Sequence, residues 1–152
     1  MPANNLLHNS LLPFIGKTEK KVTFYITDIF HCEGLELTKE QFLVLKFLHD
    51  KDGRIQNDLA FITNRSKTSL TRLLHTMEKK GLVLRTISKN DKRANNVFLT
   101  EQGKRIFETS MPILKIIIDD LESGISKKDI ETTKKVLMKI QGNIKNKTTI
   151  NQ

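Results

Sequence analysis

The side chains best suited to binding a polyanion stand on one predicted helix, over residues 66–80. Its sequence is SKTSLTRLLHTMEKK, in which apolar residues recur at steps of three and four and form one face. A polar stripe with the same steps, together with the N-terminal end, holds Ser66, Lys67, Thr68, Thr71, Arg72 and His75. Hydroxyl and guanidinium groups can read base edges in a DNA major groove, and a helix N-terminus attracts phosphate. Taken alone, the pattern fits an ordinary amphipathic helix with a solvated polar face equally well.

A second group of basic side chains follows in SKNDKRANNVFLTEQG, residues 88–103. The charged residues of its polar run are Lys89, Asp91, Lys92 and Arg93. The run lies between two short β-prone segments, residues 81–87 and 97–99. This arrangement predicts a β-hairpin, and the connector is long enough for its tip to project into solvent.

The net charge of this chain is concentrated in its middle. Over 152 residues the formal charge is +9. Residues 54–105 contain 12 Lys and Arg against 4 Asp and Glu, so this segment carries +8 and the remainder +1. A local excess of this size favours a polyanionic partner, usually nucleic acid, over a basic surface that binds nothing.

Other classes of protein have little support in the sequence. There is no Gly-rich phosphate loop and no His, Asp and Ser set at a recognisable spacing, so we expect no enzyme and no cofactor. The N-terminus lacks the pattern of a signal peptide, and no apolar run approaches the roughly 18 residues of a membrane span. We therefore expect a cytoplasmic protein that does not bind a membrane.

The single cysteine, Cys32, excludes an intramolecular disulfide. We expect its thiol to be buried and inert, with oxidant sensing as the alternative. The run His31-Cys32-Glu33 is able to contribute to a metal site, but the four His are too scattered to predict one.

The order of elements around the two basic groups points to one fold. An apolar pattern predicts a helix near residues 9–33, and Thr38 opens the next helix with Gln41 as its capping-box partner. A short helix over residues 56–63 precedes a turn at Asn64-Arg65. The helix capped by Ser66 then ends at Gly81 and leads into the hairpin. Helix, tight turn, helix and hairpin predict a mainly α fold with a small β-wing, a winged helix-turn-helix.

Two further helices follow the hairpin. Thr100 caps a helix over residues 101–122, and Ser126 caps the last one. The last helix carries a near-heptad seam of Ile130, Thr133, Leu137, Ile140 and Ile144. Such a seam packs either within the chain or against a second subunit. We favour the subunit, because long helices flanking so small a core have little of their own chain to bury against.

The segment from Gly53 to Glu108 resembles the core of the multiple-antibiotic-resistance regulator (MarR) family of winged-helix repressors. The resemblance rests on Leu59-Ala60, on Ser69 and Leu73, on the EKKGLV stop, and on the wing signature Asp91-x-Arg93 followed by Leu99-Thr100 and Gly103. It covers about residues 35–122 strongly, and the flanking helices match in position only. An Asp-x-Arg wing at this distance from a helix-turn-helix is a specific combination.

The resemblance implies a domain plan and a partner. Residues 1–145 would form one domain, in which about 36–101 are the DNA-binding lobe and about 9–33 and 102–145 the dimerisation helices. The tail, residues 146–152, looks disordered. The resemblance also implies a homodimer on a palindromic site in double-stranded DNA. It places Arg93 in the minor groove, whose negative potential attracts Arg, and gives Asp91 the role of holding it.

A repressor of this kind would be relieved by a small ligand or another signal. Relatives place aromatic effectors between the dimer helices and the DNA-binding lobe, so Phe24, Tyr25, Phe30 and Phe47 are candidates to line such a pocket. Packing in the core is the alternative role for each. The alternative for the whole chain is a winged-helix protein that binds another protein, or that coats DNA without sequence preference.

Overall fold

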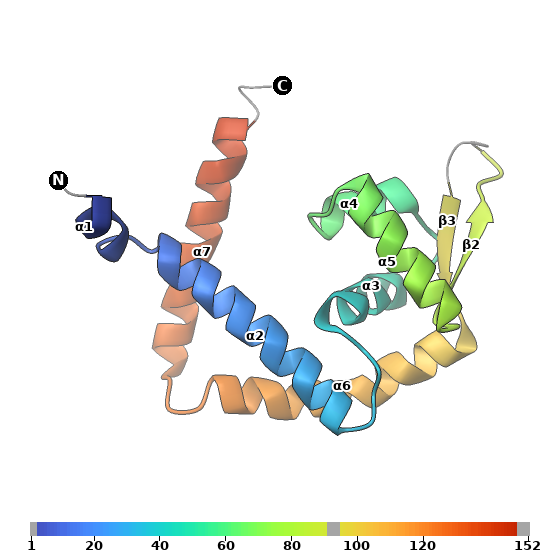
Figure 1. The fold of residues 1–152 in the computed structure, drawn as a ribbon, viewed down its shortest axis with the longest axis horizontal. Coiled ribbons are helices and arrows are strands. Elements are labelled where there is room, and N and C mark those ends of the chain that lie inside the picture. The colour runs from blue at the N-terminus through green and yellow to red at the C-terminus, as the bar shows by residue number, and fades with distance from the viewer. Residues whose placement is uncertain (1–2, 91–94, 149–152) are drawn as a thin grey trace. The chain divides into compact units, whose positions relative to one another are not determined.

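The computed structural model of the chain describes residues 3–90 and 95–148. Its elements in chain order (Figure 1) are α1 (Ala3–His8), α2 (Leu12–Cys32), α3 (Lys39–Asp50), β1 (Arg54–Ile55), α4 (Gln56–Ile62), α5 (Lys67–Lys79), β2 (Val83–Ile87), β3 (Asn95–Leu99), α6 (Glu101–Leu121) and α7 (Lys127–Thr148). They form two compact units, one through Lys115 and one from Ile116, and α6 contributes to both. The fold is mainly α with a small sheet, as the sequence predicts.

The start of α3 is fixed by the predicted capping box. The Thr38 hydroxyl accepts a hydrogen bond from the Gln41 backbone N–H at 3.2 Å, and the Gln41 side chain accepts one from the Thr38 N–H at 3.2 Å. The Lys39 N–H donates to the Thr27 hydroxyl on α2, and its ammonium group lies 3.3 Å from the Glu19 carboxylate. Hydrogen bonds from Thr23 and Lys39 hold the pKa of Glu19 below its ordinary value. These contacts join α2 to the first turn of α3.

The core of the first unit is built around α3. Val44, Leu45 and Leu48 are fully buried, which confirms that this helix is covered on much of its circumference. The Phe42 ring lies 5.7 Å from that of Phe30 on α2 and is stacked on Phe107 of α6 at the same distance. Apolar burial of this kind is the main favourable term in folding, and here it places three helices around one centre.

The turn between α4 and α5 is a Schellman motif. Asn64 has a positive φ of 55°, a conformation that Asn tolerates better than most residues. The Asn64 N–H donates to the Phe61 carbonyl, and the Arg65 N–H donates to the Ala60 carbonyl. The chain therefore reverses within two residues, and Ser66 starts α5 by accepting a hydrogen bond from the Ser69 N–H at 3.1 Å. This is the predicted helix-turn-helix.

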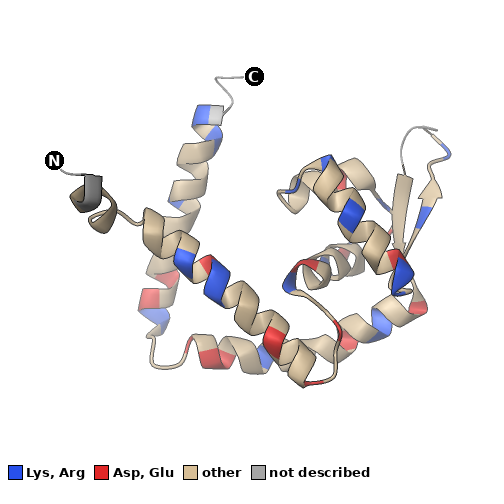
Figure 2. Cartoon of the chain, viewed as in Figure 1, with Lys and Arg blue, Asp and Glu red and all other residues tan. Residues whose placement is uncertain are grey.

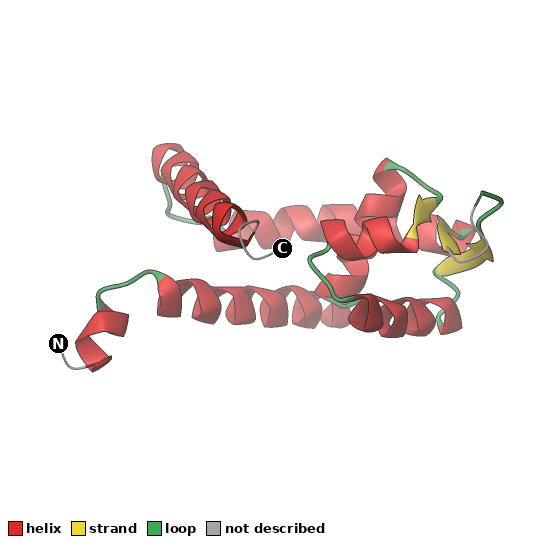
Figure 3. Ribbon diagram, turned by 90° about the horizontal axis from the view of Figure 1, so that it is seen from above, coloured by secondary structure: helices red, strands yellow, loops and turns green. Residues whose placement is uncertain are grey.

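The sheet has three antiparallel strands in the order β1-β3-β2, drawn in yellow in Figure 3. Strands β2 and β3 form the predicted hairpin. Val83 pairs with Leu99 at the base of the hairpin, and Ile87 pairs with Asn95 at the end next to the connector. The third strand, β1, pairs Arg54 with Val97. The sequence alone predicts only that Ile55 is extended, because a two-residue strand carries no periodicity.

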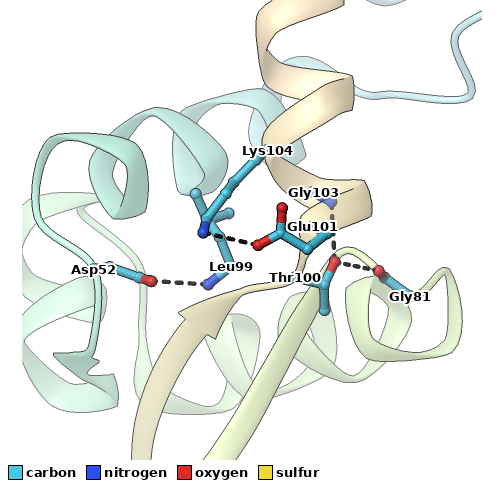
Figure 4. A network of polar contacts seen from close by, with 7 residues as sticks. All are labelled: Asp52, Gly81, Leu99, Thr100, Glu101, Gly103 and Lys104. Carbon is cyan, nitrogen blue, oxygen red and sulfur yellow. Dashed lines mark hydrogen bonds and ion pairs between the residues drawn. The ribbon is translucent and has the colours of Figure 1, made fainter.

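The base of the wing is held by a network of polar contacts (Figure 4). The Thr100 hydroxyl donates to the Gly81 carbonyl at 2.6 Å and accepts from the Gly103 N–H at 2.9 Å, so it caps α6 as predicted. Asp52 accepts a hydrogen bond from the Leu99 N–H at 2.8 Å. The Thr100 side chain thus joins the base of the hairpin to α6. The Asp52 side chain joins β3 to the segment that follows α3.

The second unit contains the end of α6 and all of α7. The Ser126 hydroxyl accepts from the Asp129 N–H at 3.1 Å, which confirms the predicted cap. Within the seam, Thr133, Leu137 and Ile144 are exposed. The last helix extends through Thr148, so residues 146–148 are helical where the sequence suggested a disordered tail. Residues 149–152 lie outside the described part of the chain.

Candidate nucleic-acid interface

The two faces of α5 have opposite exposure. Leu70, Leu74 and Met77 are fully buried, and Leu73 is half-buried. The predicted polar stripe is exposed throughout, at Thr68, Thr71, Arg72 and His75. The buried face fixes the helix on the lobe, so the hydroxyls and the guanidinium of the other face are presented on a rigid element rather than on a loop.

The N-terminal end of α5 is flanked by two hollows. One of about 370 Å³ lies between this end and the α2–α3 contact, and its lining includes Glu19, Lys39 and Arg65. A second, of about 420 Å³, follows the side of α5 between Arg65 and Thr76. The Arg65 guanidinium donates to the Ser69 hydroxyl at 2.7 Å, which holds its charge beside the first turn of α5. Sequence reasoning placed Arg65 only in the turn.

Thr71, near the middle of the exposed stripe, is held by a residue that sequence reasoning missed. The Gln56 side-chain amide, at the start of α4, donates to the Thr71 hydroxyl at 2.9 Å. The same hydroxyl donates to the Lys67 carbonyl at 2.8 Å. A Gln at the first position of the first helix was the only signal in the sequence, and nothing local relates it to a residue 15 positions later.

The hairpin is joined to α5 by an ion pair between Arg85 on β2 and Glu78, whose side chains are 20% and 32% exposed. Lys89 is exposed at the beginning of the polar connector, whereas Ser88 is buried and accepts a hydrogen bond from the Asn90 N–H. The predicted tip residues Asp91, Lys92 and Arg93 lie outside the described part of the chain. Figure 1 shows that β2 runs back along α5 toward the side on which α5 begins.

Both α5 and the hairpin carry basic side chains. Figure 2 shows Lys and Arg on α5 and on β2. On α5 itself the only acidic residue is Glu78, and this one is paired with Arg85. The exposed stripe therefore offers hydroxyls and unopposed positive charge, the set of groups suited to phosphates and base edges.

Comparisons with known proteins agree with this geometry. A family sequence model described as "MarR family" matches residues 37–94. Transcriptional regulator HosA of Escherichia coli is 30% identical over 105 residues, which are 69% of this chain and 78% of HosA. The chain belongs to the MarR family. Members of this family are DNA-binding transcriptional regulators, not enzymes, and that is the class of this protein.

Solved structures give the same fold. MepR of S. aureus, in a complex with DNA, superimposes with a TM-score of 0.81 at 25% identity, over 89% of this chain and 98% of MepR. The transcriptional regulator SlyA has the same TM-score at 20% identity, over 95% of this chain and all of its own. Both superpositions cover more of the chain than residues 35–122, the part over which the sequence resembles the MarR pattern strongly.

The four aromatic residues proposed for an effector site have different surroundings. Phe24 is 74% exposed, Tyr25 is half-buried, and Phe30 is fully buried against Phe42. Phe47 is half-buried, with the Lys46 ammonium 5.0 Å from its ring centroid. Neither of the two hollows beside α5 includes any of them in its lining. The structure thus does not bring the four together around one of these hollows.

The prediction that the Cys32 thiol is buried is wrong. Cys32 is exposed, not buried, because it is the last residue of α2 and the chain turns away there at Glu33-Gly34. Across residues 3–90 and 95–148, no three His, Cys, Asp or Glu side chains gather as a metal-ligand set. Over the same residues, no helix is both long and apolar enough to span a membrane.

Proposed function

We propose that this MarR-family protein is a homodimeric, sequence-specific repressor that binds a palindromic operator in the cytoplasm. The observation that carries the proposal is the exposed polar stripe of α5, which stands on a helix whose opposite face buries Leu70, Leu74 and Met77 fully. A helix so anchored can enter a major groove in one register, and its side chains can then discriminate between base pairs.

Two structural relatives support DNA as the partner. MepR was solved in a complex with DNA. CouR, described as a transcriptional repressor bound to a 23-mer DNA duplex, superimposes with a TM-score of 0.80 at 22% identity. We infer that the winged helix of this chain is used in the same way, with α5 in the major groove and the hairpin beside it.

The proposed DNA contacts fall into two groups. Thr71 and Arg72 in the middle of the stripe would read base edges, and Ser66, Thr68 and His75 lie on the same exposed surface. Lys67, Lys89 and Lys92 would contact phosphates, which position a protein without reading the sequence. Arg93 would enter the minor groove, with Asp91 holding its guanidinium.

A dimer is supported by the apolar surface that each unit leaves exposed. In the first unit the exposed apolar residues of the N-terminal helices are Leu6, Leu7, Leu11, Leu12, Phe14 and Phe24. On α7 they are Val136, Leu137, Met138 and Ile144. Exposed apolar surface of this extent favours an interaction site, and a second copy of the chain can cover the surface of each unit by a self-complementary contact.

The proposed release of DNA by a small ligand or another signal concerns the same helices. An aromatic effector held near Phe24, Tyr25, Phe30 or Phe47 would act on α2 and α3, which are joined by the Lys39 contacts. Because α3 and α4 belong to the same core as α5, a change there would move the recognition helix. Ligand screening by thermal shift, followed by DNA release, tests this part of the proposal.

Selection of bound sequences from a random DNA pool tests the function directly. A specific repressor should enrich one inverted repeat and bind it at least about 10³-fold more tightly than unrelated DNA. A nonspecific DNA-coating protein would enrich no consensus, and a protein-binding winged helix would retain little DNA at physiological salt. Either result would contradict the proposal.

A further inference from the structure

The hydroxyl group of Thr71 is occupied within the protein. Its hydrogen goes to the Lys67 carbonyl at 2.8 Å, and it accepts the Gln56 amide N–H at 2.9 Å. A threonine hydroxyl has one hydrogen to donate and two lone pairs. Thr71 therefore has no hydrogen left for a base acceptor, and only one lone pair remains.

Both hydrogen-bond partners of this hydroxyl are groups of the protein itself. Lys67 provides backbone of α5 itself, and Gln56 is a half-buried residue at the start of α4. Thr71 is nevertheless exposed. What is left for contact is one acceptor lone pair and the methyl group, and the two hydrogen bonds hold this methyl group in one rotamer.

A methyl group on a recognition helix matches one feature of the major groove. Guanine presents N7 and O6 acceptors, adenine presents N7 and an amino group, and cytosine presents an amino group. Thymine alone presents an apolar C5 methyl, with which a threonine methyl makes a favourable contact. Resting on the DNA binding proposed above, we propose that Thr71 reads a thymine methyl and that Gln56 is the residue that positions it.

The contrast with Arg72 makes the inference specific. Arg72 is exposed on the same stripe, and its guanidinium can donate to base acceptors. Neighbouring positions on α5 would then divide the reading of the site between a hydrogen-bond donor and an apolar contact. Sequence reasoning counted Thr71 among the hydroxyls that read bases by hydrogen bonding, and the Gln56 contact changes that assignment.

Uracil differs from thymine only by lacking the C5 methyl, so replacing thymines singly by deoxyuridine in the selected operator isolates the contact. We expect one thymine position, the same in both half-sites, to be sensitive to this replacement. There the affinity of the full-length wild-type protein should fall by about fourfold per half-site, the effect of one buried methyl group. Equal affinity for every uracil-substituted operator would overturn the proposal.

Variants of Thr71 assign the contact to the methyl group. Thr71→Ser keeps the hydroxyl and removes the methyl, so it should bind the thymine and uracil operators equally. Thr71→Val keeps a methyl and should retain the preference for thymine, because a helical valine is held in one rotamer by its own β-branching, whereas threonine depends on its hydrogen bonds. The matched control is Thr76→Ser, since Thr76 is also exposed on α5 and bonded to the carbonyl four residues before it, at 3.2 Å. A thymine preference that survives in Thr71→Ser but disappears in Thr71→Val would show that the hydroxyl reads the base.

Gln56→Met tests the positioning role, because Met has a similar length and no amide donor. We expect a lower thymine-to-uracil affinity ratio with unchanged binding to nonspecific DNA. A variant that loses thermal stability but keeps the ratio would show that Gln56 is structural only. If the random pool yields no consensus at all, the proposed function fails and this inference with it. A consensus without sensitivity to uracil removes only the inference.

Discussion

Arg72 and Lys67 allow the two kinds of DNA contact to be separated residue by residue. Both are exposed on α5, but Arg72 lies within the stripe and Lys67 at its N-terminal end. Arg72→Ala should change the consensus recovered from a random pool and cost about 1–3 kcal/mol on the wild-type operator. Lys67→Ala should weaken all sequences alike and reduce the salt slope by about 1. An unchanged consensus with Arg72→Ala would show that this face of α5 does not read bases.

Arg93 carries the corresponding prediction for the wing. Arg93→Ala should weaken operator binding by about 1–3 kcal/mol without lowering the thermal unfolding temperature, because the sequence predicts Arg93 in a polar connector outside the apolar core. Lys51→Ala is the matched control, since Lys51 is an exposed cation in the turn that follows α3. Fluorescence anisotropy at moderate salt compares the three proteins. Equal affinity of Arg93→Ala and wild type would exclude the minor-groove role.

At the scale of elements, the close approach of α6 to the base of the hairpin depends on Gly103. A Cβ atom at this position would lie 2.1 Å from the Leu82 carbonyl oxygen, which is backbone and cannot rotate away. Gly103→Ala should therefore destabilise the protein by about 1–3 kcal/mol or more, the range of overpacked sites. Urea unfolding at fixed protein concentration measures it.

Gly16 supplies the control for that substitution. It lies in α2, where an added Cβ would meet nothing within 4 Å. Gly16→Ala should leave the protein as stable or up to about 1 kcal/mol more stable, because Ala is the better helix former. If Gly103→Ala were as harmless as Gly16→Ala, the packing of α6 on Leu82 would have to be looser than described.

The elements that could be predicted are those whose signals are local. Thr38 with Gln41, Ser66 and Thr100 each cap a helix through contacts three residues apart, and Gly81 ends α5 with a positive φ of 72°. The buried stripe of α5 follows from its period alone. Such signals suffice to place α3, α4, α5 and the hairpin, and therefore the exposed stripe.

The features that could not be predicted depend on contacts between distant residues. β1 is a strand because Arg54 pairs with Val97. Asp52 accepts a hydrogen bond from the Leu99 N–H, 47 positions later in the sequence. The Gln56–Thr71 hydrogen bond belongs to the same class, and together with the local bond to the Lys67 carbonyl it occupies the Thr71 hydroxyl. The exposure of Cys32 likewise depends on where α2 ends in space. Period and capping rules say nothing about such pairs.

At the scale of the whole molecule, the α7 seam should be part of the dimer interface. Leu137 is 40% exposed and lies within the seam. Leu137→Glu would place an unpaired carboxylate in an apolar contact, so the dimer dissociation constant should rise by at least about tenfold. Lys139→Glu, which changes an exposed residue of the same helix outside the seam, should leave the dimer unchanged. Sedimentation velocity over a concentration series measures both, and a dimer unaffected by Leu137→Glu would place the interface elsewhere.

Two winged helices of one dimer should hold two half-sites at a fixed spacing. The most direct test is the affinity for the selected operator with 5 base pairs inserted between the half-sites, measured by anisotropy beside the unaltered operator. Five base pairs turn one half-site by about half a helical turn, since a turn takes about 10–10.5 base pairs. A rigid pair of recognition helices can then reach only one half-site, so the affinity should fall toward the nonspecific level, which is about 10³-fold weaker or more. An affinity that does not change on insertion would show that each winged helix binds its half-site independently of its partner.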